Sequence, residues 1–311
     1  MNLQQLEYVI AVDSYRHFAS AAQKCFVTQP TLSMMIQRLE EELSVIIFDR
    51  SRQPVVPTEI GAAIITQARK VVKEAAKMKE LVREAKGEVE GELRLGIIPT
   101  LAPYLLPLFL KSFIARHPRV KLAVSELITG QVMVKLKNGE LDAGLVVTPL
   151  NETGISEMPL FYERFFVYTS KDETVYRKKY VHTSDIDVHH LWLLEEGHCF
   201  RSQIVRLCEL KKQHLMNEQF QFEAGSIETL KKLVDGGTGI TIIPELAAVG
   251  YSTKDRKKIR QFREPVPSRE VSLVTERQFV KQSLLEALRS EILASLPDEL
   301  MKKRRKRVVA I

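Results

Sequence analysis

The residues most able to do chemistry are two cysteines in the second half of the chain. Cys199 stands between His198 and Arg201, and Cys208 follows nine positions later. The thiolate is the reactive form of cysteine, and neighbouring cations lower the pKa of a thiol. A helix that begins after Gly197 would add the positive end of its dipole. We therefore expect a reactive thiol at Cys199, which peroxide would oxidise to a sulfenic acid that a second thiol can convert to a disulfide.

The spacing of the pair suggests what such a reaction would do to the fold. If residues 199–208 are helical, nine steps give a rise of roughly 13.5 Å, whereas a disulfide needs Cα atoms within about 7 Å. The helix and the disulfide exclude each other. Formation of the disulfide would therefore remodel residues 199–208, as a redox switch requires. Two inert buried cysteines are the alternative. The spacing disfavours a zinc site, although His189 and His190 lie nearby in sequence. The third cysteine, Cys25, is expected to be a packed thiol.

Composition describes a soluble, core-forming chain. Of its 311 residues 45% are hydrophobic and 27% are charged. The chain has no apolar run near the ~18 residues that span a bilayer, and its N-terminus lacks the features of a signal peptide. We therefore expect a cytoplasmic protein without a membrane partner. The net charge of +7 says little about nucleic acid, because the run Lys302–Arg307 supplies six of those charges. We favour a solvated, disordered end for this run over a DNA-binding arm.

Residues 1–58 predict a helical unit that ends in a small wing. A second helix is expected over about 18–24, and Thr28 is a suitable N-cap for a third, with Pro30 in its first turn. This is a helix-turn-helix pattern, whose second helix would enter the major groove of DNA. A plain helical hairpin with a solvated polar face is the alternative. The residues expected to contact bases or phosphates are Gln29, Pro30, Thr31, Ser33, Gln37, Arg38, Arg50 and Arg52.

Residues 59–90 predict a long linker helix followed by a hinge. Apolar residues recur at alternating steps of four and three, which is the seam of a coiled coil. Pairing with a second chain is expected, and packing on the same chain is the alternative. The residues of this seam are Ile64, Ala68, Val71, Ala75, Met78 and Val82.

Residues 91–311 alternate strands and helices, which predicts a mixed α/β domain with parallel strands. The length suggests two lobes. Ligands of such sheets bind where strands give way to helices, and Thr100 and Thr129 stand at junctions of this kind. The expected parts are lobe I at about 91–164 and 268–300, lobe II at about 165–267, and the basic tail 301–311.

A set of short motifs runs through the N-terminal part of the chain. They are Ala21-Ala22, the run Val27 to Ser33, Leu39-Glu40, Leu43, Phe48-Asp49-Arg50, and Thr58 with Gly61. Together they resemble the signature of LysR-type transcriptional regulators, and the resemblance continues over nearly the whole chain. It implies a winged helix-turn-helix, a linker helix that pairs chains into dimers, and a two-lobed effector domain like the periplasmic binding proteins. The implied partners are promoter DNA, RNA polymerase and further copies of the chain in a tetramer.

A second set of motifs surrounds the cysteine pair. They are Glu195 to Arg201 with Cys208, Ile98 to Thr100 with Pro103 to Pro107, and Ser226 to Leu230. They resemble the peroxide-sensing members of the same family, which implies that Cys199 is the peroxidatic cysteine and Cys208 the resolving one. The residues expected around the bound peroxide are Thr100, Thr129, Gly197, His198, Arg201, Ser202 and Arg269. Ser202 departs from the pattern, which usually has an acid there, and this departure puts the proton relay and the reaction rate in question.

The expected function is therefore redox-controlled transcription. Peroxide would oxidise Cys199, a disulfide with Cys208 would form, and the remodelled domain would change promoter binding and the transcription of oxidative-stress genes. No catalytic turnover, cofactor or metal is expected. One alternative is a regulator of the same family that binds a small organic effector, with Cys199 merely lining its cleft. The other is a thiol peroxidase, which would have no use for a DNA-binding half.

Overall fold

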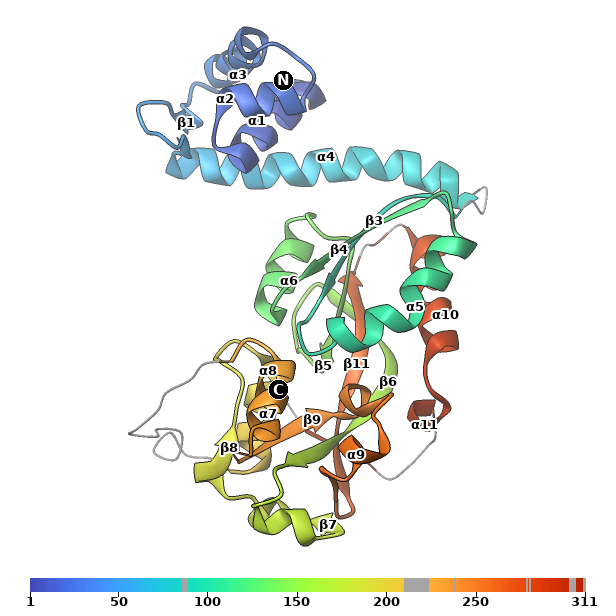
Figure 1. Cartoon of the computed structure of the whole chain (residues 1–311). Coiled ribbons are helices and arrows are strands. Elements are labelled where there is room, and N and C mark those ends of the chain that lie inside the picture. The colour runs from blue at the N-terminus through green and yellow to red at the C-terminus, as the bar shows by residue number, and fades with distance from the viewer. Residues whose placement is uncertain are drawn as a thin grey trace. The chain divides into compact units, whose positions relative to one another are not determined.

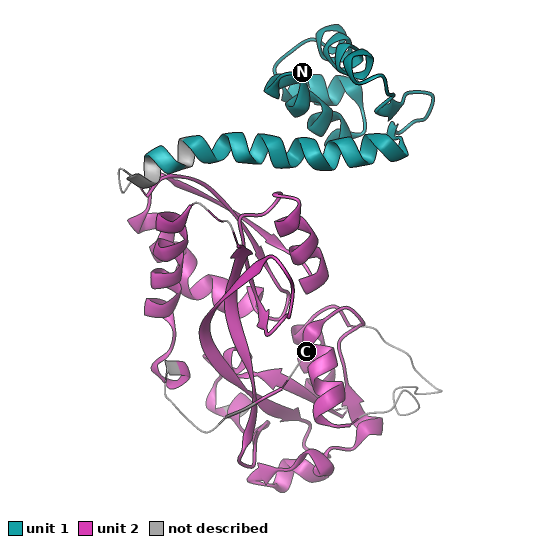
Figure 2. Cartoon of the chain, turned by 180° about the vertical axis from the view of Figure 1, so that it is seen from behind, with its two compact units in different colours: residues 1–88 teal, residues 89–311 magenta. Residues whose placement is uncertain are grey.

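The chain folds into two compact units, Met1–Glu88 and Val89–Ile311, which Figure 2 colours separately. The computed structural model describes residues 1–85, 89–209, 224–237, 239–277, 279, 281–301 and 306–309. Within these residues, the first unit has one hydrophobic core and the second has two. No helix in these described ranges is both long and apolar enough to cross a membrane.

The first unit is a winged helix-turn-helix (Figure 1). Its elements are α1 (Leu3–Tyr15), α2 (Phe18–Lys24), α3 (Gln29–Leu43) and the antiparallel wing strands β1 (Phe48–Asp49) and β2 (Val56–Pro57). The N-cap predicted at Thr28 is confirmed, since its hydroxyl accepts a hydrogen bond from the N–H of Thr31 at 3.4 Å. Leu32, Ile36 and Leu39 face the core, Met35 packs partly against it, and the exposed face of α3 is mostly polar, with Met34 and Leu43 as exposed apolar residues.

The linker helix α4 (Glu59–Ala85) starts as part of this unit. Ala68 is buried in the same core as α1, and Ile64 packs partly against it. The intramolecular alternative therefore holds for the start of the predicted seam, because these side chains already have apolar neighbours on their own chain. Further along, Met78 and Val82 are 65% and 56% exposed.

The second unit is a two-lobed α/β domain built around two long antiparallel strands, β6 (Ile155–Thr169) and β11 (Val266–Glu276). They run side by side through both lobes (Figure 1). The first half of β6 contributes Phe161 to the core of lobe I, and the second half contributes Phe165 to the core of lobe II. These two strands are therefore the frame that connects the lobes.

The other strands extend this frame on both sides. Among the described residues the sheet order is β4-β3-β5-β11-β6-β10-β7, with β12 on β11 and β8-β9 on β6. Strands β3, β4 and β5 are parallel as predicted, whereas β11 is antiparallel to both β5 and β6, so the sheet is mixed. The strands are β3 (Gly91–Ile97), β4 (Val120–Glu126), β5 (Ala143–Thr148), β7 (Tyr180–Val181), β8 (Leu191–Trp192), β9 (Ile240–Pro244), β10 (Ile259–Phe262) and β12 (Lys306–Val308).

Helices cover the sheet in both lobes (Figure 1). The α-helices of this unit are α5 (Ala102–Arg116), α6 (Thr129–Lys137), α7 (Cys199–Leu207), α8 (Ile227–Asp235), α9 (Thr253–Arg256), α10 (Gln282–Ser295) and α11 (Asp298–Met301). Short 3-10 turns cover Thr174–Arg177, Thr183–Asp185, Val188–His190 and Glu245–Ala248. Helices α6 and α7 matter most for function, because their first residues meet near the boundary of the lobes, where Ile128 approaches Gly197.

The C-terminal end differs from the expectation. Residues 302–305 of the basic run lie outside the described residues, but the end predicted to be disordered is ordered from Lys306 to Val309. Strand β12 pairs in parallel with the start of β11, and Val309 is buried in the core of lobe II. The charged run dominates the local composition, so the prediction of disorder did not take into account the two valines that follow it, Val308 and Val309.

Candidate functional site

Helix α7 places the two cysteines at its opposite ends. Cys199 is the first residue of the helix and Cys208 is its C-cap. Both are free thiols. The helix anticipated for this segment is thus observed, and nine residues of helix separate the Cα atoms by roughly 13.5 Å. Because a disulfide needs about 7 Å, α7 and a bond between Cys199 and Cys208 cannot coexist.

The start of α7 is fixed by local chemistry and by packing. Gly197 has φ +95°, a conformation that side chains rarely adopt, and it turns the chain into the helix. A Cβ atom at this position would meet the side chain of Ile128, which immediately precedes α6, at 3.4 Å. Phe200 and Ile204 then enter the core of lobe II. This turn and this packing bring the thiol of Cys199 against the first residue of α6.

The electrostatic surroundings of Cys199 are different from those predicted. Burial is the largest influence and raises the pKa of the thiol, while the charge of Arg269, the hydroxyl of Thr129 and the N–H of Phe200 lower it in part. The expectation that His198 and Arg201 lower this pKa is wrong. Arg201 donates instead to the carbonyl oxygen of Leu194 at 2.8 Å, and the cation that acts on the sulfur comes from β11.

Arg269 is a completely buried cation held on several sides. Its Nη1 donates to Thr100 Oγ1 at 2.8 Å, and its Nη2 donates to the Thr100 carbonyl oxygen at 3.1 Å. Its Nε donates to Glu163 Oε1 at 2.8 Å. The guanidinium carbon lies 4.9 Å from the centre of the Phe200 ring. Thr100 and Arg269, both predicted as site residues, are therefore in direct contact, and Phe200 connects them to α7.

Glu163 is a member of this cluster that sequence reasoning missed. It stands directly opposite Arg269 in the pairing of β6 with β11 and also accepts a hydrogen bond from the N–H of Leu246 at 3.0 Å. Burial raises the pKa of its carboxyl group, and Arg269 opposes that shift. A signal was present, because Phe161, Glu163 and Phe165 share one face of a strand. A carboxylate between two inward phenylalanines needs a buried partner.

Of the remaining predicted pocket residues, Thr129 and His198 lie near Cys199, whereas Ser202 faces solvent. The Thr129 hydroxyl is buried, makes no well-formed hydrogen bond to any residue the structure describes, and lies near enough to Cys199 to lower its pKa. His198 is buried beside Cys199, and its Nε2 lies 3.5 Å from Glu195 Oε1. Ser202, in contrast, is exposed on α7.

Cys208 occupies an apolar place at the end of α7. It packs against the core of lobe II, and this burial raises the pKa of its thiol to about 12. A thiol with so high a pKa is a poor nucleophile while the helix is intact. Within the described part of the chain, no group of three or more His, Cys, Asp or Glu side chains gathers into a possible metal site.

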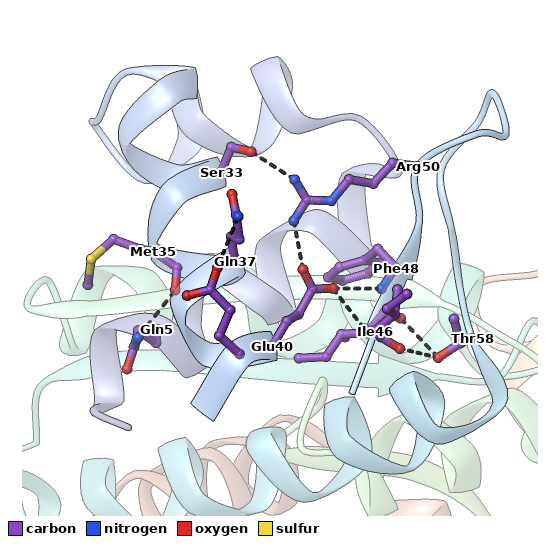
Figure 3. A network of polar contacts seen from close by, with 11 residues as sticks. Gln5, Ser33, Met35, Gln37, Glu40, Ile46, Phe48, Arg50 and Thr58 are labelled. Atoms are coloured by element: carbon purple, nitrogen blue, oxygen red, sulfur yellow. Dashed lines mark hydrogen bonds and ion pairs between the residues drawn. The ribbon is translucent and has the colours of Figure 1, made fainter. Parts of the chain in front are cut away.

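The candidate DNA-binding residues lie on the outer face of α3 and on the wing. Arg50 donates to Ser33 Oγ at 3.0 Å and to Glu40 Oε2 at 2.8 Å, as Figure 3 shows. Its guanidinium also lies 5.0 Å from the centre of the Phe18 ring. Arg52 pairs only with Asp49, at 3.1 Å, among the described contacts. The exposed members of the predicted set are Gln29, Pro30, Thr31, Gln37, Arg38, Arg50 and Arg52, and Ser33 is half-buried.

Glu40 connects α3 to the wing and was also missed. Its Oε1 accepts hydrogen bonds from the N–H groups of Ile47, at 2.7 Å, and Phe48, at 3.3 Å (Figure 3). Its other oxygen holds Arg50. This carboxylate therefore orients the arginine relative to α3.

Comparison with known proteins identifies the family. The model of the LysR substrate binding domain matches residues 86–297, and that of the bacterial regulatory helix-turn-helix protein, lysR family, matches residues 3–62. The chain belongs to the LysR family. The predicted fold class, a winged helix-turn-helix, a linker helix and a two-lobed α/β effector domain, is thereby confirmed.

Individual LysR-family relatives refine the comparison. A hydrogen peroxide-inducible genes activator of Haemophilus influenzae is 34% identical over 274 residues, which cover 88% of this chain and 90% of the relative. Full-length OxyR C199D from Pseudomonas aeruginosa matches with a TM-score of 0.79 and 32% identity, covering 94% of this chain and 98% of that one. The regulator EstR of Acinetobacter baylyi is 31% identical over 285 residues, 91% of this chain and 93% of the relative. The predicted resemblance to peroxide-sensing members is confirmed.

Proposed function

We propose that this chain is a transcription regulator that senses hydrogen peroxide through Cys199 and reads promoter DNA with α3 and the wing. The observation that carries the proposal is α7, a short helix with a free thiol at each end and a buried guanidinium acting on the first of them. The similarity to a peroxide-inducible activator over 88% of the chain supports peroxide as the sensed molecule.

The first step oxidises Cys199. Its thiolate attacks one oxygen of hydrogen peroxide, the O–O bond breaks, and the departing hydroxide takes up a proton and leaves as water, so that the sulfur becomes a sulfenic acid. Arg269 stabilises the negative charge that the sulfur must carry before attack. The buried Thr129 hydroxyl, which makes no well-formed hydrogen bond to a described residue, is available to bind the peroxide.

The second step joins the two sulfurs. The Cys208 thiolate attacks the sulfenic sulfur, the S–O bond breaks, and the departing hydroxide is protonated to water. Two thiols and one peroxide thus yield one disulfide and two waters. This step needs α7 to unwind for two reasons. Unwinding brings the two sulfurs within bonding distance. It also exposes Cys208, which returns the pKa of its thiol from about 12 towards its ordinary value.

The result of oxidation is a change in the packing of lobe II. We assign DNA reading to residues 1–58, pairing of chains to the helix within 59–90, and sensing to 91–311, with lobe I at about 91–164 and 268–300 and lobe II at about 165–267. In a dimer or tetramer, remodelling of the sensing domain changes the spacing of the α3 helices on promoter DNA, and so changes the recruitment of RNA polymerase. The cytoplasm, where thiols are kept reduced, is the compartment that suits such a sensor. Each chain reacts once per signal, without a cofactor.

Thiol mapping tests this proposal directly. The full chain is treated with one equivalent of peroxide, and the state of each cysteine is read by mass spectrometry, in parallel with transcription from a target promoter. We expect a Cys199–Cys208 disulfide in the native sequence, its absence in Cys199→Ser, and no effect of Cys25→Ser, the matched control. A free Cys208 beside an oxidised Cys199 refutes the disulfide step. An unchanged promoter response to peroxide in Cys199→Ser refutes the sensor.

The match to the LysR substrate binding domain favours one second candidate, a regulator that responds to a small organic effector. In that case Cys199 would line the effector site, and Cys199→Ser would leave the response to peroxide unchanged. A thiol peroxidase would instead consume peroxide repeatedly with a dithiol reductant in the absence of DNA. We expect a single turnover per chain.

A further inference from the structure

Residues 306–309 contact both α7 and β11, the strand that carries Arg269. Strand β12 places Val308 opposite Ser268 of β11, and the N–H of Val309 donates to the Ser268 carbonyl oxygen at 2.8 Å. On its other side, the Val309 carbonyl oxygen accepts a hydrogen bond from Gln203 Nε2 at 2.7 Å. Residues 306–309, named here the C-terminal strap, therefore bridge β11 and the middle of α7.

The strap is docked by burial as well as by hydrogen bonds. Val309 is 7% exposed and belongs to the same apolar cluster as Phe200 and Ile204 of α7, against which Cys208 also packs. Val308, one residue earlier, is 44% exposed. This alternation is that of a strand with one face in the core, and it makes Val309 the anchor of the strap.

Gln203 makes the contact specific. Its side chain is completely buried, and its Oε1 has no hydrogen-bond partner among the residues that the structure describes. The described partner of its Nε2 is the strap. If the strap left, a buried amide would lose that partner and would have to be rehydrated or rearranged, which is unfavourable. The strap and the folded state of α7 therefore support each other.

We propose that the C-terminal strap holds α7 in its helical form and keeps Cys208 covered, so that release of the strap is part of the switch. Gln203 lies between Cys199 and Cys208 in α7, and any unwinding that joins the two sulfurs must move it away from Val309. By reciprocity, whatever loosens the strap favours the unwound helix. The consequence for peroxide sensing rests on the proposed function above, whereas the covering of Cys208 in the reduced chain does not.

Two adjacent valines provide a matched test in the reduced, full-length chain. Val309→Ser removes the buried anchor, and Val308→Ser makes the same change at an exposed position of the same strap. Each thiol is alkylated with iodoacetamide, and the rates are followed by mass spectrometry. We expect Cys208 to react about tenfold faster in Val309→Ser, since apolar burial docks the strap, and at the native rate in Val308→Ser. Cys25, in the other unit, serves as the internal standard.

The outcomes separate a strap from general loosening. An unchanged rate at Cys208 in Val309→Ser overturns the proposal, and so does an equal acceleration of Cys25, which would mean global destabilisation. If Val309→Ser does not fold, Gln203→Met decides the matter, because it keeps the volume of the side chain and removes the hydrogen bond to Val309. We expect a severalfold faster reaction of Cys208 in that variant, and no change would contradict the strap.

Redox equilibration tests the link to the switch. In glutathione buffers of graded potential, the equilibrium ratio of the Cys199–Cys208 disulfide to the dithiol should be about tenfold higher in Val309→Ser than in the native sequence. The conservative variant Val309→Ile should show the native ratio. If the native chain forms no such disulfide, the proposed function fails while the alkylation rates still decide whether the strap covers Cys208. If the disulfide forms but its balance is insensitive to Val309→Ser, the strap plays no part in the switch.

Discussion

Helices α3 and α7 carry the two proposed activities, and they differ in how their first turns are held. In α3, the Thr28 side chain caps the first turn, and Ser44 closes the last turn in the left-handed conformation. In α7, His198 makes no side-chain cap hydrogen bond, whereas Glu209, directly after the C-cap Cys208, closes the other end in the left-handed conformation. A helix of nine residues is marginal by itself. The first turn of α3 is thus satisfied by local contacts, whereas α7, which is short and has no side-chain cap at its start, depends on packing against its neighbours.

The ion pairs near the two helices also differ, because those near α3 lie at the surface and the one near α7 is buried. Arg50 and Arg52 form ion pairs at the surface, where each pair contributes roughly 0–1 kcal/mol. Arg269 and Glu163 are completely buried, and an unpaired charge in such a place is strongly unfavourable. Surface pairs can be exchanged for contacts with phosphate at little loss. The buried pair cannot be exchanged, and so it holds the sensing site in one arrangement.

The largest expected effect comes from breaking the buried pair. Arg269→Met leaves the Glu163 carboxylate without its cation, and we expect the stability of the sensing domain to fall by roughly 3–5 kcal/mol. Urea unfolding of the reduced chain measures this. Arg269→Met combined with Glu163→Leu should recover most of the stability but not the rate at which peroxide oxidises Cys199. Recovery of both would mean that Arg269 has a structural role only.

The pH profile of Cys199 should show the next largest effect. Because burial raises the pKa of this thiol, the thiolate fraction should grow roughly tenfold per pH unit between pH 7 and 9, and the oxidation rate with it. Stopped-flow oxidation of the Cys208→Ser variant measures the rate. The stability that the buried neutral thiol contributes is present below its ordinary pKa and is lost as the pH rises through the raised value. A rate that levels off below pH 8 would show that the thiolate is already formed.

In the winged helix-turn-helix, substitutions of Arg50 and Arg52 should have different effects on stability. Arg50→Ala loses the contacts with Ser33, Glu40 and Phe18, and we expect a loss of about 1 kcal/mol in unfolding free energy. Arg52→Ala, at a side chain that is 70% exposed, should leave stability unchanged. If each arginine contacts a phosphate, each substitution should reduce the salt slope of promoter binding by about 1. An unchanged slope would remove that arginine from the DNA interface.

The difference between the two helices also explains what could be predicted from the sequence. The start of α3 follows from Thr28 and Pro30, because capping is decided within a few residues. The helix at α7 could be placed in the same way. The cation beside Cys199 could not be placed from local sequence, and the resemblance to the family alone pointed to Arg269. Arg201 is near in sequence but donates to Leu194, whereas Arg269 reaches the thiol through the pairing of distant strands.

Pairings between strands account for the other errors. Glu163 meets Arg269 only in the register of β6 with β11, which no local pattern specifies. The C-terminal strap was assigned to a disordered end because charge dominates the residues before it, and its docking depends on β11 and on Gln203. The alternation of Phe161, Glu163 and Phe165 was the available clue to the first of these.

The smallest expected effect concerns Ser202, where the resemblance to peroxide-sensing members of the family implies an acid. Ser202 is exposed near the N-terminal end of α7, and a carboxylate there should stabilise the helix by about 0.5 kcal/mol through its dipole. Ser202→Asp should therefore disfavour the disulfide about twofold, since a more stable α7 is harder to unwind. It should also slow oxidation slightly, because added negative charge disfavours a thiolate. Ser202→Asn is the neutral control, and glutathione buffers and stopped-flow oxidation are the measurements. Faster oxidation in Ser202→Asp would instead mean that an acid at this position takes part in proton transfer, and that Ser202 limits the rate at which Cys199 is oxidised.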